Sequence, residues 1–182
     1  MADLVNAGDL SDPGDQGDPG DLLVRRADTA DPVDRAALER MWLMFRHDMS
    51  EFAGQLPNPD GSFRSEWLQS ALEDENWAAY LALVGDRPAG FAFVRALEQP
   101  TRVLNSFFIV RGARRGGYGM RFVKQVLAAH PGPWEIAFQE RNVQGAKFWR
   151  RVAAEVAGDA WHEEVRPPLT GGTVPNVWVV IP

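Results

Sequence analysis

The stretch Arg114-Arg115-Gly116-Gly117-Tyr118-Gly119 decides how this sequence is interpreted. It follows the apolar run Phe107-Phe108-Ile109-Val110 and precedes residues 120–127, where apolar side chains recur with helical spacing. A strand that enters a glycine-rich turn and then a helix gathers unpaired N–H groups at the positive end of the helix dipole. Glycines also let the backbone approach a diphosphate closely. The stretch therefore predicts an anion-binding loop, to which Arg114 and Arg115 add positive charge.

The spacing of the glycines excludes two familiar phosphate-binding loops. A Walker A loop requires a Gly-Lys pair, and the sequence contains none. A dinucleotide-binding fingerprint requires a third glycine at the position that Phe122 occupies. The observed pattern is R-x-x-G-x-G, formed by Arg114, Gly117 and Gly119. On these residues alone, a tight strand–helix turn with a solvated arginine pair remains the alternative.

Composition restricts the class of protein. The 182 residues suit one domain, and 45% hydrophobic residues with seven tryptophans suffice for a packed core. The absence of cysteine excludes disulfides, zinc thiolates and a cysteine nucleophile. We find no run of about 18 apolar residues and no signal-peptide pattern. We therefore expect a cytoplasmic protein with no membrane partner.

Residues 1–21 differ from the rest of the chain. They contain six aspartates and no lysine or arginine, which accounts for the whole formal net charge of −6. Their glycine, proline and aspartate bury too little apolar area to offset ordering entropy, so we predict a flexible tail. Calcium binding is the alternative, but the spacing does not match an EF-hand loop and we expect no metal. Residues 22–182 form the predicted domain; its balanced charge does not suggest a nucleic-acid partner.

From Leu22 onward, the pattern of apolar residues predicts one mixed α/β domain. A hairpin turn is expected at Gly85-Asp86-Arg87-Pro88. The last strand either pairs across a dimer or is buried, so we expect a monomer or a homodimer. Strands are expected at 22–26, 77–84, 89–96, 102–110, 134–139, 161–165 and 177–181; helices are expected from Asp31-Pro32 and over 65–72, 120–127 and 142–152.

Together these features resemble the GNAT superfamily of N-acetyltransferases. There the fourth strand leads into Q/R-x-x-G-x-G/A at the start of a helix, and a fifth strand and a helix beginning near an asparagine follow. Residues 142–149 resemble the segment N-x-x-A-x-x-F/L-Y, with Gly145 at the usual alanine and Trp149 at the usual tyrosine. Residues 45–52 and 148–150 also resemble a subgroup of acetyltransferases of unassigned substrate. The resemblance covers about residues 22–182 and leaves out the tail.

The resemblance implies a mixed central sheet that is splayed between its fourth and fifth strands and flanked by helices. The opening takes the pantetheine arm of acetyl-CoA, which pairs with the backbone of residues 108–110. The loop holds the pyrophosphate, and Asn142 lies beside the cofactor arm. Phe148 and Trp149 either wall the thioester site or, as is usual for tryptophan, belong to the core. The implied cofactor-binding residues are Phe108, Ile109, Val110, Arg114, Arg115, Gly116, Gly117, Tyr118, Gly119, Met120, Asn142, Phe148 and Trp149.

The acid and base of the resembled family do not recur at their usual positions. Trp149 replaces the tyrosine credited as general acid, and an indole N–H does not transfer its proton near neutral pH. Ala137 stands where one subgroup carries a glutamate base. Glu135 lies two residues earlier on the same strand face and is the substitute candidate. A solvated strand glutamate is the alternative.

A polar group closes the first predicted helix, where the resemblance places the acceptor pocket. It consists of His47, Asp48 and Glu51. An imidazole is a side chain that can accept a proton near neutral pH, and the carboxylates attract a cationic amine. A polar helix end with a histidine near the C-terminal dipole explains the same residues. These three residues and Glu135 are the candidate catalytic residues.

The sequence thus predicts an N-acetyltransferase. It would move the acetyl group of acetyl-CoA to a primary amine of a small molecule or peptide, by direct attack in a ternary complex. A non-catalytic acyl-CoA sensor of the same fold is the alternative, because the expected acid and base are replaced. A phosphate-binding protein unrelated to coenzyme A is the third hypothesis.

Overall fold

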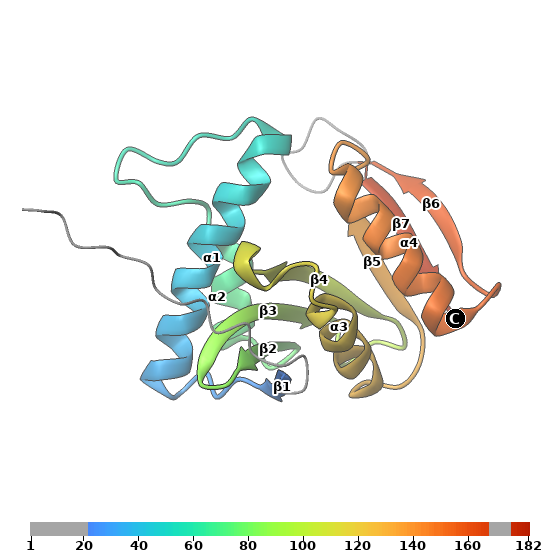
Figure 1. The fold of residues 1–182 in the computed structure, drawn as a ribbon, viewed down its shortest axis with the longest axis horizontal. Coiled ribbons are helices and arrows are strands. Elements are labelled where there is room, and N and C mark those ends of the chain that lie inside the picture. The colour runs from blue at the N-terminus through green and yellow to red at the C-terminus, as the bar shows by residue number, and fades with distance from the viewer. Residues whose placement is uncertain (1–21, 168–175) are drawn as a thin grey trace, which may run out of the picture.

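The computed structural model describes residues 22–167 and 176–182, so the predicted tail at 1–21 lies outside the described residues. One seven-stranded sheet has the strand order β1-β2-β3-β4-β5-β7-β6, and β4–β5 is its parallel pair. This confirms the single mixed α/β domain (Figure 1). The elements are β1 (Leu22–Arg26), α1 (Pro32–Ala53), α2 (Glu66–Glu73), β2 (Trp77–Val84), β3 (Arg87–Arg95), β4 (Arg102–Ile109), the 3-10 turn η1 (Arg111–Ala113), α3 (Tyr118–Ala128), β5 (Trp134–Phe138), α4 (Val143–Ala157), β6 (His162–Arg166) and β7 (Asn176–Ile181).

The sheet carries a separate hydrophobic core on each face. Helices α1 and α2 cover β1 to β4 on one face, where Trp42, Phe91 and Phe93 pack together. Helices α3 and α4 cover the other face, where Phe122 and Val152 are fully buried. Figure 1 shows α3 in front of the sheet, between α1 and α4. The face of β5, β7 and β6 opposite α4 has no helix among the described residues.

Helix boundaries follow local capping. Helix α1 begins at Pro32 because the Asp31 carboxylate accepts a hydrogen bond from the Val33 N–H at 3.1 Å, as predicted. Helix α4 begins after Asn142, whose Oδ1 accepts from the Gly145 N–H at 2.9 Å. It runs five residues past the predicted end because nothing breaks its apolar stripe before residue 158.

The hairpin turn is shorter than predicted. Strand β3 begins at Arg87, so Gly85 and Asp86 alone form the turn, with φ of 60° at Gly85. The register shifts between Ala82↔Gly90 and Leu83↔Pro88, which leaves Ala89 without a partner and places Pro88 next to a bulge. A proline is tolerated there because its missing N–H takes no bond from a regular ladder. The prediction treated this proline as part of the turn.

Strand β7 lies inside the sheet. It pairs with β5 along one edge, from Trp134↔Ile181 to Phe138↔Val177, and with β6 along the other. Both of its edges are therefore occupied. The strand is therefore buried within the sheet, as one of the two alternatives predicted, and it has no open edge for pairing across a dimer.

The parallel strands β4 and β5 part soon after they meet. They pair at Arg102↔Trp134, Val103↔Glu135 and Leu104↔Ile136. Beyond these positions β4 continues to Ile109 and β5 to Phe138 without further pairing. The predicted splay is confirmed. It leaves one edge of the end of β4 open beside the loop that follows.

A bulge marks the point where the strands part. On its other edge β4 pairs with β3 at Phe93↔Ser106 and then at Val94↔Leu104, so Asn105 has no partner in the register. Bulges bend a strand and redirect its side chains. The Asn105 amide oxygen accepts from Arg95 Nε at 3.1 Å, which fixes the side chain beside the opening.

Candidate active site

The glycine loop turns through two left-handed residues. Arg115 has φ of 71° and Gly117 has φ of 78°. A non-glycine residue in this region is uncommon, and such strain persists where the surrounding structure requires it. The two residues direct the chain from the end of β4 into the first turn of α3.

The start of α3 has no side-chain cap among the described residues, unlike the starts of α1 and α4. Its N-cap is Gly117, and the first helical bond runs from the Arg121 N–H to the Gly117 carbonyl at 3.2 Å. The N–H groups of Gly119 and Met120 therefore point out of the helix start without a capping side chain. Such a start is a ready anion site.

The two loop arginines have different roles. Arg114 folds back from the loop: its Nε donates to the Ile109 carbonyl at 2.8 Å, and its guanidinium lies 5.6 Å from the Phe108 ring centroid. It therefore lies on the α1 face of the sheet. Arg115 is exposed and has no hydrogen-bond or ion-pair partner within the described ranges. Arg115 is the loop side chain available to a phosphate.

The end of β4 offers fewer backbone groups than predicted for pantetheine. The Val110 N–H donates to the Ala89 carbonyl of β3 at 2.9 Å. The Ile109 carbonyl accepts from Arg114. Because successive residues of a strand point their backbone groups to opposite edges, the Ile109 N–H and the backbone of Phe107 face the opening. Among residues 108–110, Ile109 is thus the one directed toward β5.

Aromatic residues close the α3–α4 side of the opening. Phe107 of β4 stacks on Phe148 at 5.7 Å between centroids and meets Trp149 edge-on at 5.3 Å. A Cβ at Gly119 would lie 3.5 Å from the Phe148 ring, so the start of α3 also touches this group. Trp149 is 9% exposed and belongs to the core. Phe107, which the sequence interpretation did not include, joins the two predicted aromatic residues.

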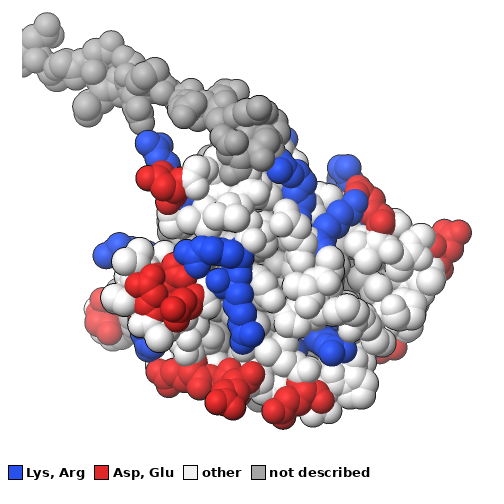
Figure 2. All heavy atoms as spheres, turned by 90° about the horizontal axis from the view of Figure 1, so that it is seen from below, with Lys and Arg blue, Asp and Glu red and all other residues white. Residues whose placement is uncertain are grey.

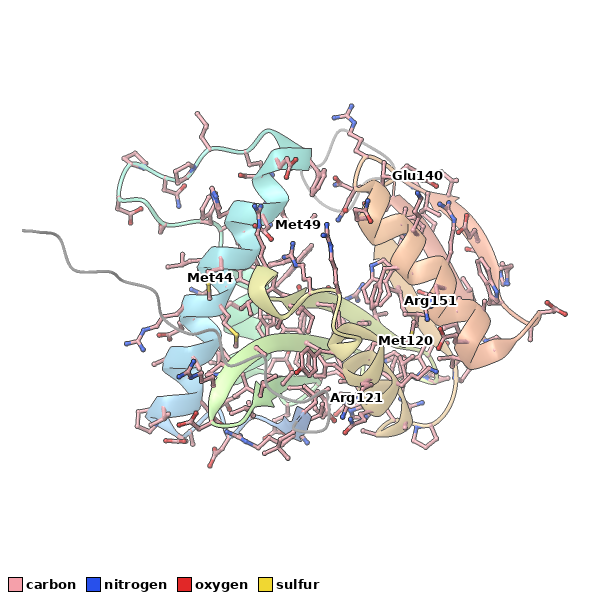
Figure 3. The ribbon with its side chains drawn as sticks, viewed as in Figure 1. Met44, Met49, Met120, Arg121, Glu140 and Arg151 are labelled. Carbon is pink, nitrogen blue, oxygen red and sulfur yellow. The ribbon has the colours of Figure 1, made fainter. Side chains whose placement is uncertain are left out.

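Two of the three polar residues at the end of α1 are exposed, and the third is not. His47 and Glu51 lie on the surface. The side chain of Asp48 is 16% exposed and forms ion pairs with Arg111 and Arg114. Burial alone would raise the pKa of Asp48, but the hydrogen bonds from Arg114 and Arg111 outweigh it and hold the pKa below its ordinary value. In Figure 3, Met49 marks the part of α1 that also carries Asp48, and Glu140 marks the turn before α4.

Glu135 lies on the helix-free face of the sheet and is also paired. Both of its carboxylate oxygens accept from Arg166, at 2.8 and 2.9 Å. The Arg166 guanidinium stacks over the Trp178 ring at 4.7 Å and also binds Glu164. Burial lowers the pKa of Arg95 below its ordinary value, and the negative charge of Glu135 offsets part of this lowering. The candidate base is therefore held in a bidentate ion pair.

Some of these partners gave no signal in the sequence. Arg111 and Arg166 belong to no motif, and each finds its carboxylate through tertiary structure. Phe107 was visible as part of an apolar run, but its direction depends on the bulge. The alternation of apolar and polar residues along β5 was the sequence feature that indicated on which face Glu135 lies.

Residues 22–167 and 176–182 contain no group of three or more metal-ligating side chains. No described helix is long and apolar enough to cross a bilayer. In Figure 2, basic and acidic side chains alternate in small groups on the face shown, rather than forming one basic surface.

Solved structures share this arrangement although their sequences differ. A GNAT-family protein from Desulfovibrio desulfuricans matches with a TM-score of 0.61 at 13% identity, over 88% of this chain and 98% of its own. A ribosomal-protein alanine N-acetyltransferase from Escherichia coli matches at 0.60 and 12%, over 88% and 93%. An aminoglycoside 6'-N-acetyltransferase complexed with coenzyme A matches at 0.58 and 13%, over 87% and 95%.

Comparison of sequences finds no relative, in contrast to comparison of structures. No protein-family model and no curated protein sequence matches the chain. In this chain the domain has a seven-stranded mixed sheet with the parallel pair β4–β5, beside which the glycine loop begins α3. The chain has the fold of the GNAT acetyltransferases.

Proposed function

We propose that this protein is an N-acetyltransferase that uses acetyl-CoA to acetylate a primary amine. One observation carries the proposal: the uncapped start of α3, behind the left-handed Gly117, lies beside the parted strands β4 and β5. An anion site and an open strand edge side by side suit a ligand with a diphosphate and an amide-bearing arm. The matching fold of a protein solved with coenzyme A supports this choice.

In the proposed complex, the pyrophosphate lies against the N–H groups of Gly119 and Met120, near Arg115. The pantetheine arm extends the sheet along β4 and pairs with the Ile109 N–H. Phe107, Phe148 and the buried Trp149 exclude water from the α4 side of the thioester. Asn142 contributes by fixing the start of α4, since its oxygen already caps that helix.

The reaction follows from holding two substrates in line. The neutral amine attacks the thioester carbonyl, the carbon–sulfur bond breaks, and the amine's proton leaves to a base while the thiolate takes a proton from solvent. Positioning alone contributes several kcal/mol to such a step. We propose Glu135 as a base, which requires Arg166 to leave its carboxylate, and the exposed His47 and Glu51 as residues that meet the acceptor. The acceptor is a small molecule or a peptide, and the reaction takes place in the cytoplasm.

Calorimetric titration with acetyl-CoA tests the proposal, followed by measurement of thiol release with a panel of small amines and peptides. We expect saturable binding and thiol release that depends on an amine. A protein that does not bind acetyl-CoA is not an acetyltransferase of this kind. Binding without release for every amine would instead favour the acyl-CoA sensor.

We expect Glu135→Gln to lower kcat/KM by about tenfold, less than the factor of about 100 or more that a strong general base contributes. The reason is that Arg166 occupies both carboxylate oxygens and must be displaced before either can accept a proton. The measurement is the pH profile of kcat/KM. Glu164→Gln is the control, because it loosens Arg166 and leaves Glu135 in place. Equal losses in both variants with an unmoved profile would show that Glu135 only supports the sheet.

A further inference from the structure

The carboxylate of Asp48 links α1 to the cofactor loop. Its Oδ1 accepts a hydrogen bond from Arg111 Nε at 3.1 Å and lies 2.8 Å from Arg111 Nη2 in an ion pair, and its Oδ2 accepts from Arg114 Nη2 at 2.5 Å. The Asp48 side chain is 16% exposed, whereas those of Arg111 and Arg114 are 69% and 42% exposed, so the carboxylate is the more shielded partner in both bridges. Both oxygens are therefore used within the protein.

Arg114 extends this link to the end of β4. Its Nε donates to the Ile109 carbonyl, and its guanidinium lies over the Phe108 ring. One turn before Asp48, Phe45 packs on the same Phe108 ring at 6.1 Å. Helix, loop and strand end are thus joined by charged and apolar contacts on one face of the sheet.

The direction of Arg114 matters for its role. Its guanidinium lies on the α1 face, whereas the start of α3 packs on the opposite face with Phe122. The charge of Arg114 is neutralised by Asp48 and is directed away from the predicted anion site. Arg115 and the helix start then meet the phosphates, while Arg114 holds the backbone that presents them.

We propose that Asp48 is a positioning residue for the cofactor: through Arg111 and Arg114 it holds the glycine loop and the end of β4 in the shape that binds acyl-CoA. This inference rests on the proposed function. It assigns Asp48 to binding rather than to proton transfer. Two guanidinium groups engage both oxygens of Asp48, through two hydrogen bonds and one further ion-pair contact.

The role has a distinctive kinetic signature. When Asp48 is removed, the loop samples other conformations, and the cofactor must select the competent one. The loss of affinity then appears as a higher Kd and a higher KM for acetyl-CoA. A general base would act on the chemical step, and its loss would lower kcat instead.

The test compares Asp48→Asn, Asp48→Glu and Arg111→Gln with the wild-type protein. We expect Asp48→Asn to raise Kd and KM for acetyl-CoA by about tenfold with kcat within about twofold, and Arg111→Gln to give a smaller rise because one bridge remains. Asp48→Glu keeps the charge and should recover part of the affinity. Titration calorimetry gives Kd, and steady-state kinetics gives the split between KM and kcat.

The matched control is Glu39→Gln, which removes one carboxylate from α1 at an exposed pair with Arg35, far from the loop. Thermal unfolding of each variant checks that the fold is retained. An unchanged Kd for both Asp48→Asn and Arg111→Gln would overturn the inference, as would a loss confined to kcat. A wild-type protein that does not bind acetyl-CoA would instead refute the proposed function itself.

Discussion

Replacing Gly117 by valine is expected to raise the Kd for acetyl-CoA on the order of 100-fold, because a β-branched residue in the left-handed region costs about 1–3 kcal/mol. Gly117 has φ of 78° and forms the N-cap of α3. Residues 114–117 are exposed, so a strained loop can relax to another conformation in the unbound protein. The N–H groups at the start of α3 then no longer converge on the phosphates. The free energy needed to restore the strained loop conformation weakens binding. Titration calorimetry with acetyl-CoA measures the loss.

Gly117→Asn is the matched control for this substitution. Asparagine tolerates the left-handed region, and a Cβ at this position has no neighbour within 4 Å. We expect its Kd to stay within about tenfold of the wild-type value, with both variants unfolding at similar temperatures. If valine and asparagine bind acetyl-CoA as tightly as glycine does, the loop is not where the pyrophosphate lies.

Replacing Arg25 by methionine is expected to lower the free energy of unfolding by about 2–3 kcal/mol at pH 7. Arg25 forms two hydrogen bonds with Asp34, at 2.5 and 2.6 Å, and the Asp34 side chain is 4% exposed. Without Arg25 the buried carboxylate keeps only the bond from the Asp28 N–H. The expected loss is below that of a fully buried pair because Arg25 is 39% exposed and therefore screened. Urea unfolding followed by circular dichroism measures it.

The same pair predicts a dependence on pH. The Arg25 hydrogen bond lowers the pKa of Asp34, so its contribution to stability is present above the unfolded carboxyl pKa of about 4. That contribution is lost as the pH falls through the lower, folded pKa. The difference between wild type and Arg25→Met should therefore persist above about pH 4 and shrink below it. The double variant Arg25→Met/Asp34→Leu is expected to regain part of the loss, and a double variant no better than the single one would contradict this account.

Most of the fold could be predicted from local patterns in the sequence. The cap at Asp31, the helical stripe after Met120 and the alternation from Trp134 each depend on residues within one or two turns of one another. Such short-range signals are readable without a structure. The hairpin turn shows where they fail: Pro88 reads as a turn residue, but a bulge accommodates it in β3.

The proposed cofactor loop could be predicted from the sequence for the same reason. Strand, loop and helix are contiguous from Phe107 to Leu127, so the glycine spacing and the apolar period together predict an anion site. The catalytic candidates depended on side-chain partners that are distant in sequence. Asp48 meets Arg111 and Arg114 across 63 and 66 residues, and Glu135 meets Arg166 across 31. Nothing local identifies those partners.

By itself, the sequence determined the order of the elements, the loop and the helix start that follows it, because backbone conformation responds to near neighbours. Only the tertiary structure decided what each charge does. It turned Arg114 away from the anion site, placed both oxygens of Asp48 in ion pairs, and set β7 between β5 and β6. The physical reason is that burial and ion pairing are properties of the packed chain, in which residues far apart in sequence share one environment.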